Sequence, residues 1–403
     1  MLIIKCLKLS LKVKKLTTFL FLSLTTYSLQ AQSLVQAYKN RADQVSQTNI
    51  TTILQEFGNL GVKTTGSTAN TDALNWLKSK YLSYGYAASQ MSEDSFTFGS
   101  NVNAKNLIIT KTGTVYPDTY VIICGHYDTI TGPGVSDNGS GTSIILEAAR
   151  ILKDIPTEYS IKFINFSGEE QGLLGSNHYA NNVVFQNGTR QLNVRLVFNI
   201  DQVGGKLGNV NTAIKCESDQ SGQTGNNAAS LSFTQQLATC TTLYSPLQTV
   251  MSNAYSSDYM PFEANGDIIT GFYENIRSYN EHTVNDTFAN VDPTYVFNVG
   301  KAAVGALQHF AVATTSLLGT NETAANTLES IKIYPNPAKD FLNIELPKDV
   351  KNFNLEITDL NGRLILTNEN ETKINVSGLV NGAYLCTIKA NDKVAVRKII
   401  IGK

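Results

Sequence analysis

The sequence has little charge. Asp, Glu, Lys and Arg make up 16% of its 403 residues, and the formal net charge is −1. Nucleic-acid-binding proteins usually carry a clear excess of Lys and Arg, so this composition argues against nucleic acid as a partner. Apolar residues make up 42% of the chain, which is enough for a large core. The length suits two domains better than one.

The sequence also lacks an uninterrupted apolar run of membrane-spanning length. Its first apolar segment, residues 16–31, follows five lysines and is interrupted by Thr and Ser. A bilayer span needs about 20 apolar residues. A basic start, a short apolar run and a small residue at Ala31 are instead typical of a secretory signal peptide. We therefore expect residues 1–31 to be a signal peptide, cleaved before Gln32, and no stable membrane span.

Cysteine is scarce and never occurs as a Cys-x-x-Cys pair. There are five cysteines in the chain. The missing pair argues against a zinc site built from thiolates. Cys124 lies in an apolar run, and we expect it to be a buried thiol. In an oxidising compartment, Cys216 and Cys240 are the best candidates for a disulfide, and the alternative is that both are free.

Strand and helix patterns alternate through most of the chain, which predicts an α/β fold. The near-continuous apolar runs at 121–124 and 197–200 fit strands that are covered on both faces. We therefore expect a three-layer sandwich with a mostly parallel central sheet. The predicted strands are 104–113, 118–128, 159–168 and 193–201, and the predicted helices are 71–85, 141–155 and 296–312. In the first of these helices, Leu74, Leu77, Tyr81 and Leu82 are expected to share a buried face, and Gly85 to end it.

The chain is expected to divide near residue 314. Residues 32–313 would form the main domain, with residues 32–70 as its first helices rather than a propeptide. Residues 314–329 lack a sustained period and are predicted to be a linker. Residues 330–403 hold short β patterns separated by NG, PNP and ND turns, which predicts a small all-β domain.

Histidines and acidic residues follow the predicted strands of the main domain. In an open α/β sheet, ligands bind outside the carboxyl ends of the strands. We therefore expect these side chains to meet at one edge of the sheet. Two histidines with several carboxylates and no thiolate suit zinc or a similar divalent ion. The residues are His126, Asp128, Asp137, Glu169, Glu170, Asp201 and His282.

The adjacent pair Glu169 and Glu170 needs a physical reason, because two like charges repel. A cation beside the pair would offset the repulsion, with one glutamate binding the metal and its neighbour accepting a proton from a water. Each residue alone has an ordinary explanation: a buried histidine, Asp137 as a helix N-cap, the glutamates as a solvated turn. Their joint occurrence at strand ends favours a metal site.

Five segments in this order resemble the co-catalytic di-zinc aminopeptidase family, which includes secreted bacterial leucyl aminopeptidase and aminopeptidase Y. They are GHYDT, VSDNGSG, FSGEEQGLLGS, NID and EHTVNDT, and the resemblance covers most of residues 35–313. It implies that two zinc ions are the cofactors. It assigns His126 and Asp201 to one zinc, Glu170 and His282 to the other, Asp137 to both, Glu169 as general base, and Asp128 as the residue that orients His126.

The same resemblance implies hydrolysis of N-terminal residues from peptides or proteins. The segment SSDYMPF is similar to the family's Ser-Asp-His segment, with Tyr259 where His is usual, and implies that Ser257 orients His282. Aromatic residues near the late segments favour an apolar N-terminal residue, although they also suit a core. They are Tyr255, Phe262, Phe272, Tyr273 and Tyr279.

Other functions remain open. A glutaminyl cyclase would share this fold and use a single zinc, and a metallo-carboxypeptidase is a further enzymatic alternative. A non-catalytic binding module belongs to a different class, and the intact set of metal-binding residue types argues against it.

The C-terminal segments resemble the sorting domain of the type IX secretion system in Bacteroidetes. They are IYPNPAKDFLNI, ITDLNGRLI and LVNGAYLCTIKANDKVAVRKIIIG. This implies passage through the periplasm to the outer-membrane surface or the medium, with the secretion machinery as a partner. A carbohydrate-binding β module or an immunoglobulin-like spacer is the alternative.

Overall fold

The computed structural model describes residues 33–221, 225–315, 331–346, 350, 352–359, 364–390 and 393–402. The chain divides into two compact units, Met1–Leu317 and Leu318–Lys403, and each is described by itself. The expected signal peptide lies outside the described residues, as does the expected linker apart from its first two residues.

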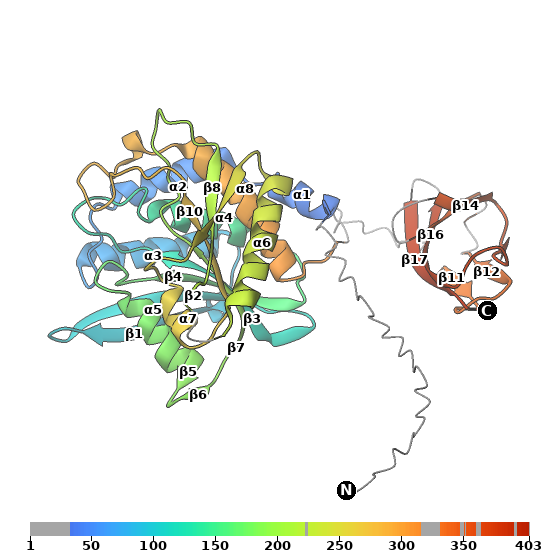
Figure 1. The fold of residues 1–403 in the computed structure, drawn as a ribbon, viewed down its shortest axis with the longest axis horizontal. Helices are drawn as coiled ribbons and strands as arrows, with labels where there is room; N and C mark the ends of the chain where they lie inside the picture. The colour runs from blue at the N-terminus through green and yellow to red at the C-terminus, as the bar shows by residue number, and fades with distance from the viewer. Residues whose placement is uncertain are drawn as a thin grey trace, which may run out of the picture. The chain divides into compact units, whose positions relative to one another are not determined.

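The first unit is built on an eight-stranded sheet with the order β1-β2-β4-β3-β7-β10-β8-β9 (Figure 1). The central strand β3 pairs in parallel with β4 and β7, β10 pairs in parallel with β7, and β8 pairs in parallel with β9. Antiparallel pairs join β1 to β2, β2 to β4 and β10 to β8. The predicted mostly parallel sheet is confirmed. The strands are β1 Met91–Phe98, β2 Val102–Lys111, β3 Tyr116–His126, β4 Tyr159–Phe166, β7 Asn193–Ile200, β8 Ala213–Ser218, β9 Gln248–Asn253 and β10 Ile269–Glu274.

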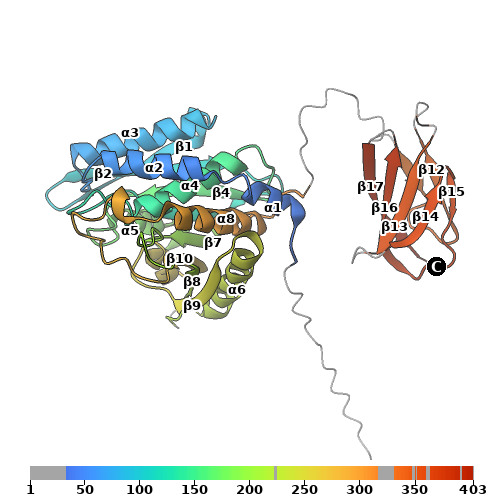
Figure 2. The same cartoon turned by 90° about the horizontal axis from the view of Figure 1, so that it is seen from above.

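Helices cover both faces of this sheet, as the three-layer prediction requires. In Figure 2, α2, α4 and α8 run side by side over one face. Successive residues of β3 alternate between the two cores, with Ile123 in one and Cys124 in the other. The first face carries α1 Gln36–Ala42, α2 Gln47–Asn59, α3 Thr68–Ser83, α4 Gly139–Leu152, α6 Asn227–Tyr244 and α8 Pro293–Phe310; the second carries α5 Leu174–Tyr179, α7 Met260–Ala264 and the short strands β5 Phe185–Gln186 and β6 Thr189–Arg190.

Two helix starts show how local sequence sets the fold. The Ser67 side chain caps α3 by accepting from the backbone N–H of Asn70. The predicted residues of α3 are buried except Leu82, which is 51% exposed because it follows Tyr81 around the helix away from the sheet. At α4 the capping side chain is Asn138, not Asp137. The carboxylate of Asp137 is therefore not used as a helix cap.

The structure distinguishes between the alternatives for the cysteines and for the residues before 70. The four cysteines in the described part of the chain form no disulfide, so of the two alternatives for Cys216 and Cys240 the structure has the one without a bridge. Both thiols are buried as small core residues, and burial raises the pKa of Cys216 to about 12. The helices α1 and α2 contribute Tyr38 and Ile50 to the core, which supports residues before 70 as part of the folded unit.

The second unit is all-β, as predicted. It has a three-stranded sheet, β11-β12-β15, and a four-stranded sheet, β14-β13-β16-β17, both antiparallel. Their inner faces share one apolar core that includes Leu355, Cys386 and Ile399. The strands are β11 Lys332–Tyr334, β12 Phe341–Glu345, β13 Asn354–Asp359, β14 Leu364–Glu369, β15 Lys373–Asn375, β16 Gly382–Ala390 and β17 Lys393–Ile401. Across both units, none of the described helices has the length and apolar character to cross a membrane.

Candidate metal centre

The residues expected at the metal site come together at the carboxyl edge of the central strands. His126 is the last residue of β3, and Asp201 follows β7 directly. The Glu169–Glu170 pair lies in the turn after β4, and His282 lies in the loop after β10. Asp137 lies just before α4. Five separate segments therefore deliver imidazole and carboxylate groups to one place.

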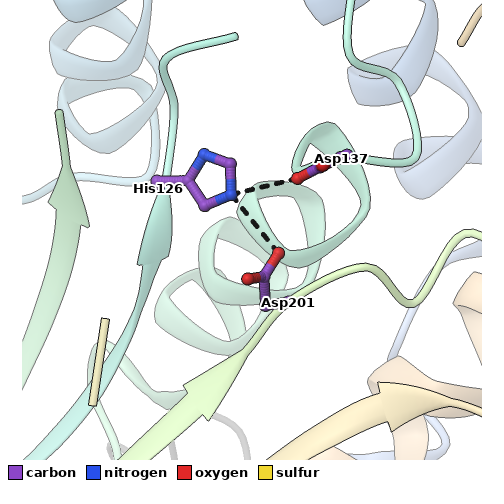
Figure 3. A group of neighbouring side chains, drawn as sticks. All are labelled: His126, Asp137 and Asp201. Atoms are coloured by element: carbon purple, nitrogen blue, oxygen red, sulfur yellow. Dashed lines mark ion pairs between the residues drawn. The ribbon is translucent and has the colours of Figure 1, made fainter. Parts of the chain in front are cut away.

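The first group consists of His126, Asp137 and Asp201, all of them buried (Figure 3). The Nε2 atom of His126 lies 3.1 Å from Oδ1 of Asp137 and 3.3 Å from Oδ1 of Asp201. Within the described residues, His126 Nε2 and Asp201 Oδ1 have no hydrogen-bond partner of acceptable geometry. Buried polar atoms are rarely left in this state. Their arrangement fits ligands that point at a shared cation.

The second group consists of Asp137, Glu170 and His282. The Nε2 atom of His282 lies 3.1 Å from Oδ2 of Asp137 and 2.8 Å from Oε2 of Glu170. Asp137 thus faces His126 with one oxygen and His282 with the other. The side chain of His282 is 49% exposed, so this group opens toward solvent while the first does not.

Two residues that the sequence analysis did not assign hold Asp137 in place. Asp286 accepts from the backbone N–H groups of Ser136 and Asp137, at 2.7 and 2.9 Å. Gln202 donates from Nε2 to Oδ2 of Asp137 at 2.6 Å. The only sequence signals were that Asp286 lies four residues after His282 and that Gln202 follows Asp201.

Ser257 supports a different residue from the one expected. Its hydroxyl donates to Oδ2 of Asp201 at 2.7 Å, so the expectation that it orients His282 is wrong. The hydroxyl of Tyr255 donates to the same oxygen at 2.8 Å. Asn199 donates in turn to Ser257 at 2.8 Å. These bonds occupy one oxygen of Asp201 and leave the other facing His126.

Asp128 contacts both the histidine and the glutamate pair. Its backbone carbonyl lies 3.1 Å from Nδ1 of His126, and its carboxylate lies 3.7 Å from the same nitrogen. The carboxylate accepts from the backbone N–H groups of Glu169 and Glu170, at 3.2 and 3.3 Å. This geometry is compatible with the predicted orienting role, and it also fixes the turn that carries the two glutamates.

The gathered carboxylates disfavour one another's ionised forms. Burial, together with Asp201, Asp258 and Asp137, raises the pKa of Glu169 to about 10. Burial and Asp137 raise the pKa of Glu170 to about 8. A divalent cation between these groups would offset the repulsion and restore the charged forms. The residues present therefore fit a metal centre.

Two cavities adjoin this centre. A cavity of about 200 Å³ is lined by site residues that include Asp137, Glu169 and His282. A larger one of about 600 Å³ shares Tyr255, Tyr273 and Arg277 with it and also reaches Tyr279. Of the five aromatic residues considered for substrate contact, Phe262 and Phe272 are instead fully buried in the two cores.

Comparison with family models gives two matches. Residues 106–307 match the model described as Peptidase family M28. Residues 332–402 match the model described as Secretion system C-terminal sorting domain. The first match contains all five segments that carried the resemblance, and the second falls in the all-β unit.

Curated relatives are similar over part of the chain. Aminopeptidase YwaD of Bacillus subtilis is 41% identical over 107 residues, which is 26% of this chain and 23% of that protein. A probable zinc metalloprotease of Pyrenophora teres f. teres is 30% identical over 188 residues, which is 40% of this chain and 39% of that protein. The chain spans less than half the length of these curated relatives.

Solved structures share the fold of the first unit. An aminopeptidase from Aneurinibacillus sp. strain AM-1 aligns with a TM-score of 0.57 and 16% identity, over 70% of this chain and 98% of that one. The glutaminyl cyclase of Porphyromonas gingivalis aligns with a TM-score of 0.52 and 20% identity, over 66% of this chain and 98% of that one. The same fold therefore carries two different chemistries, and the fold by itself does not choose between them.

Proposed function

Because the chain belongs to peptidase family M28, we propose that it is a secreted zinc aminopeptidase that removes N-terminal residues from peptides or proteins. The observation that carries the proposal is the position of Asp137. Its two oxygens lie 3.1 Å from the Nε2 atoms of two different histidines, His126 and His282. A carboxylate placed in this way suits a bridge between two metal ions.

In this proposal, two zinc ions share Asp137. His126 and Asp201 hold one ion, and Glu170 and His282 hold the other. When bound, the ions lower the pKa of a water and stabilise negative charge on the carbonyl oxygen of the scissile bond. Ser257 and Tyr255 keep Asp201 oriented, and Gln202 and Asp286 keep Asp137 oriented.

Glu169 is the proposed general base. It lines the same cavity as the metal-binding residues, and its backbone is held by the carboxylate of Asp128. Its carboxylate would accept a proton from the attacking water and deliver it to the leaving amine. The free α-amino group of the substrate would meet the carboxylates of the cavity, which gives a physical reason for attack at the chain end.

A preference for an apolar N-terminal residue is part of the proposal. Only three of the five aromatic residues named from the sequence support it. Tyr255, Tyr273 and Tyr279 line the larger cavity, and their rings can pack against hydrocarbon. The two phenylalanines do not contribute, because they are fully buried in the cores.

Metal analysis combined with a substrate panel tests the proposed function. The mature protein should contain about two zinc ions per chain and hydrolyse aminoacyl anilides, but not the same compounds with a blocked amino group. Equal cleavage of blocked and free substrates would reject the aminopeptidase assignment. A single zinc ion together with cyclisation of an N-terminal glutamine would favour the glutaminyl cyclase alternative, and release of C-terminal residues the carboxypeptidase.

The C-terminal unit points to export by the type IX system. We propose that the secretion machinery recognises this unit and that the enzyme reaches the medium or the outer-membrane surface. Deleting residues 330–403 tests this, and the truncated chain should accumulate in the periplasm. Unchanged export of the truncated chain would contradict the proposal.

A further inference from the structure

The larger cavity lies beside the cavity of the candidate metal centre. The two cavities share Tyr255, Tyr273 and Arg277. The hydroxyl of Tyr255 donates to Asp201 of the first metal group, and its ring centroid lies 4.8 Å from that of Tyr273. These two rings line both cavities and form a wall that the cavities have in common.

Lys215 lies further along this wall. It sits on β8 directly opposite Tyr273 of β10 in the antiparallel register. Its Nζ atom lies 4.9 Å from the centroid of the Tyr273 ring, and Lys215 lines the larger cavity. Among the residues that the structure describes, no carboxylate forms an ion pair with Lys215 and no group accepts a hydrogen bond from its ammonium.

The other charged residues of the cavity are already engaged. The guanidinium of Arg277 forms an ion pair with Glu281. Glu217 accepts from the hydroxyl of Tyr259 at 2.8 Å, and burial raises the pKa of Glu217 to about 8. The carboxylate of Glu217 is thus engaged by Tyr259, and within the described residues it forms no ion pair with Lys215. Lys215 is therefore a cation in the lining of this cavity that has no ion-pair partner among the described residues.

We propose that Lys215 recognises a carboxylate at the end of the substrate's N-terminal side chain. This inference rests on the proposed aminopeptidase function, and it adds glutamate to the apolar residues that the cavity would accept. The methylene groups of an N-terminal glutamate would pack against the rings of Tyr255 and Tyr273, and its carboxylate would meet the ammonium of Lys215. Glutamine has the same shape without the charge, so the enzyme should favour an N-terminal glutamate over an N-terminal glutamine.

The test compares glutamyl and glutaminyl anilides as substrates of the wild-type protein, Lys215→Met and Lys215→Arg. A charge-assisted hydrogen bond is about twice as strong as a neutral one, so the ratio of kcat/KM for glutamyl over glutaminyl substrate should fall by about tenfold in Lys215→Met. Lys215→Arg keeps the charge and should restore most of the ratio.

Lys162→Met is the matched control. Lys162 also lies over a tyrosine on the same sheet, with Nζ 4.6 Å from the centroid of Tyr120, but it does not line either cavity. Its replacement removes the same charge from the sheet and should leave the substrate ratio unchanged. An equal fall in Lys162→Met and Lys215→Met would overturn the inference, because it would show an effect of net charge alone.

A binding experiment separates this inference from the proposed function. Calorimetry should show tighter binding of L-glutamate than of L-glutamine, with the difference lost in Lys215→Met. If leucyl anilide is hydrolysed but the wild-type protein shows no preference for glutamate in either assay, the inference fails and the aminopeptidase stands. If no aminoacyl substrate is hydrolysed but glutamate binding depends on Lys215, the proposed function fails and the anion site stands. The wild-type comparison needs no variant, so a Lys215→Met protein that does not fold leaves the test intact.

Discussion

The two halves of the metal centre use similar groups in different settings. In the first, His126 and Asp201 lie at the ends of β3 and β7, both buried, and two hydroxyls hold the second oxygen of Asp201. In the second, His282 lies in a loop with a φ of +57° and a side chain that is 49% exposed. A site on strand ends is more rigid than one on a loop. For the proposed pair of ions, we therefore expect the ion of the first half to be held more firmly and the ion of the second half to exchange more easily.

The largest expected effect comes from a residue that belongs to neither half. The substitution Glu169→Gln should lower turnover by at least about 10²-fold, because it removes the proposed general base. Zinc content should not change in either half. The neighbouring variant Glu170→Gln is the control, and it should lose zinc from the second half. Unchanged turnover in Glu169→Gln would remove the base assignment.

The halves themselves can be separated by metal content. Because His282 is the exposed member of the proposed ligand set, His282→Ala should keep about one zinc ion per chain, held by the first half. His126→Ala should leave a buried pair of carboxylates without their imidazole and retain less zinc, measured by atomic absorption after dialysis. Equal zinc content in the two variants would contradict the expected difference in zinc retention between the two halves.

A smaller effect should appear when support for one half is weakened. Ser257→Ala removes a 2.7 Å hydrogen bond to Asp201, so zinc affinity of the first half should fall by about 10- to 100-fold. The adjacent exposed residue offers the control Ser256→Ala, which removes no bond to Asp201. A competition assay with a zinc-sensitive dye measures the affinity. A loss confined to the ion at His282 would contradict the assignment of Ser257 to the first half.

The smallest expected effect is on stability, in chelated protein. A hydrogen bond to Asp137 raises the pKa of His282 from its ordinary 6.5 to about 9, and the pKa of Glu170 is also raised, to about 8. The folded state then binds more protons than the unfolded state above pH 6.5. The contribution of protonated His282 is complete below pH 6.5 and is lost as the pH rises through 9. Tm should fall over this range, and less so in His282→Ala. A Tm that rises between pH 6.5 and 9 would contradict this prediction.

Much of the candidate metal centre could be predicted from the sequence, because apolar runs in the sequence indicate where the strands end. The apolar runs before His126 and Asp201 place both residues at one edge of a parallel sheet, and the structure brings them together there. The partner of Ser257 could not be predicted in the same way. It depends on how the segment before α7 approaches the end of β7, and that contact is set by packing between distant segments rather than by local spacing. The hydrogen bonds from Ser136 and Asp137 to Asp286 could not be predicted for the same reason.

Asp286 also connects the loop that carries His282 to the backbone that carries Asp137. It lies four residues after His282, and its carboxylate accepts both backbone N–H groups at Ser136 and Asp137. If the loop swings outward to release the exposed ion, it pulls on the backbone that presents the shared ligand to the other ion. In the proposed two-ion centre we therefore expect the occupancies of the two positions to be thermodynamically linked, with each ion changing the affinity for the other by the same factor.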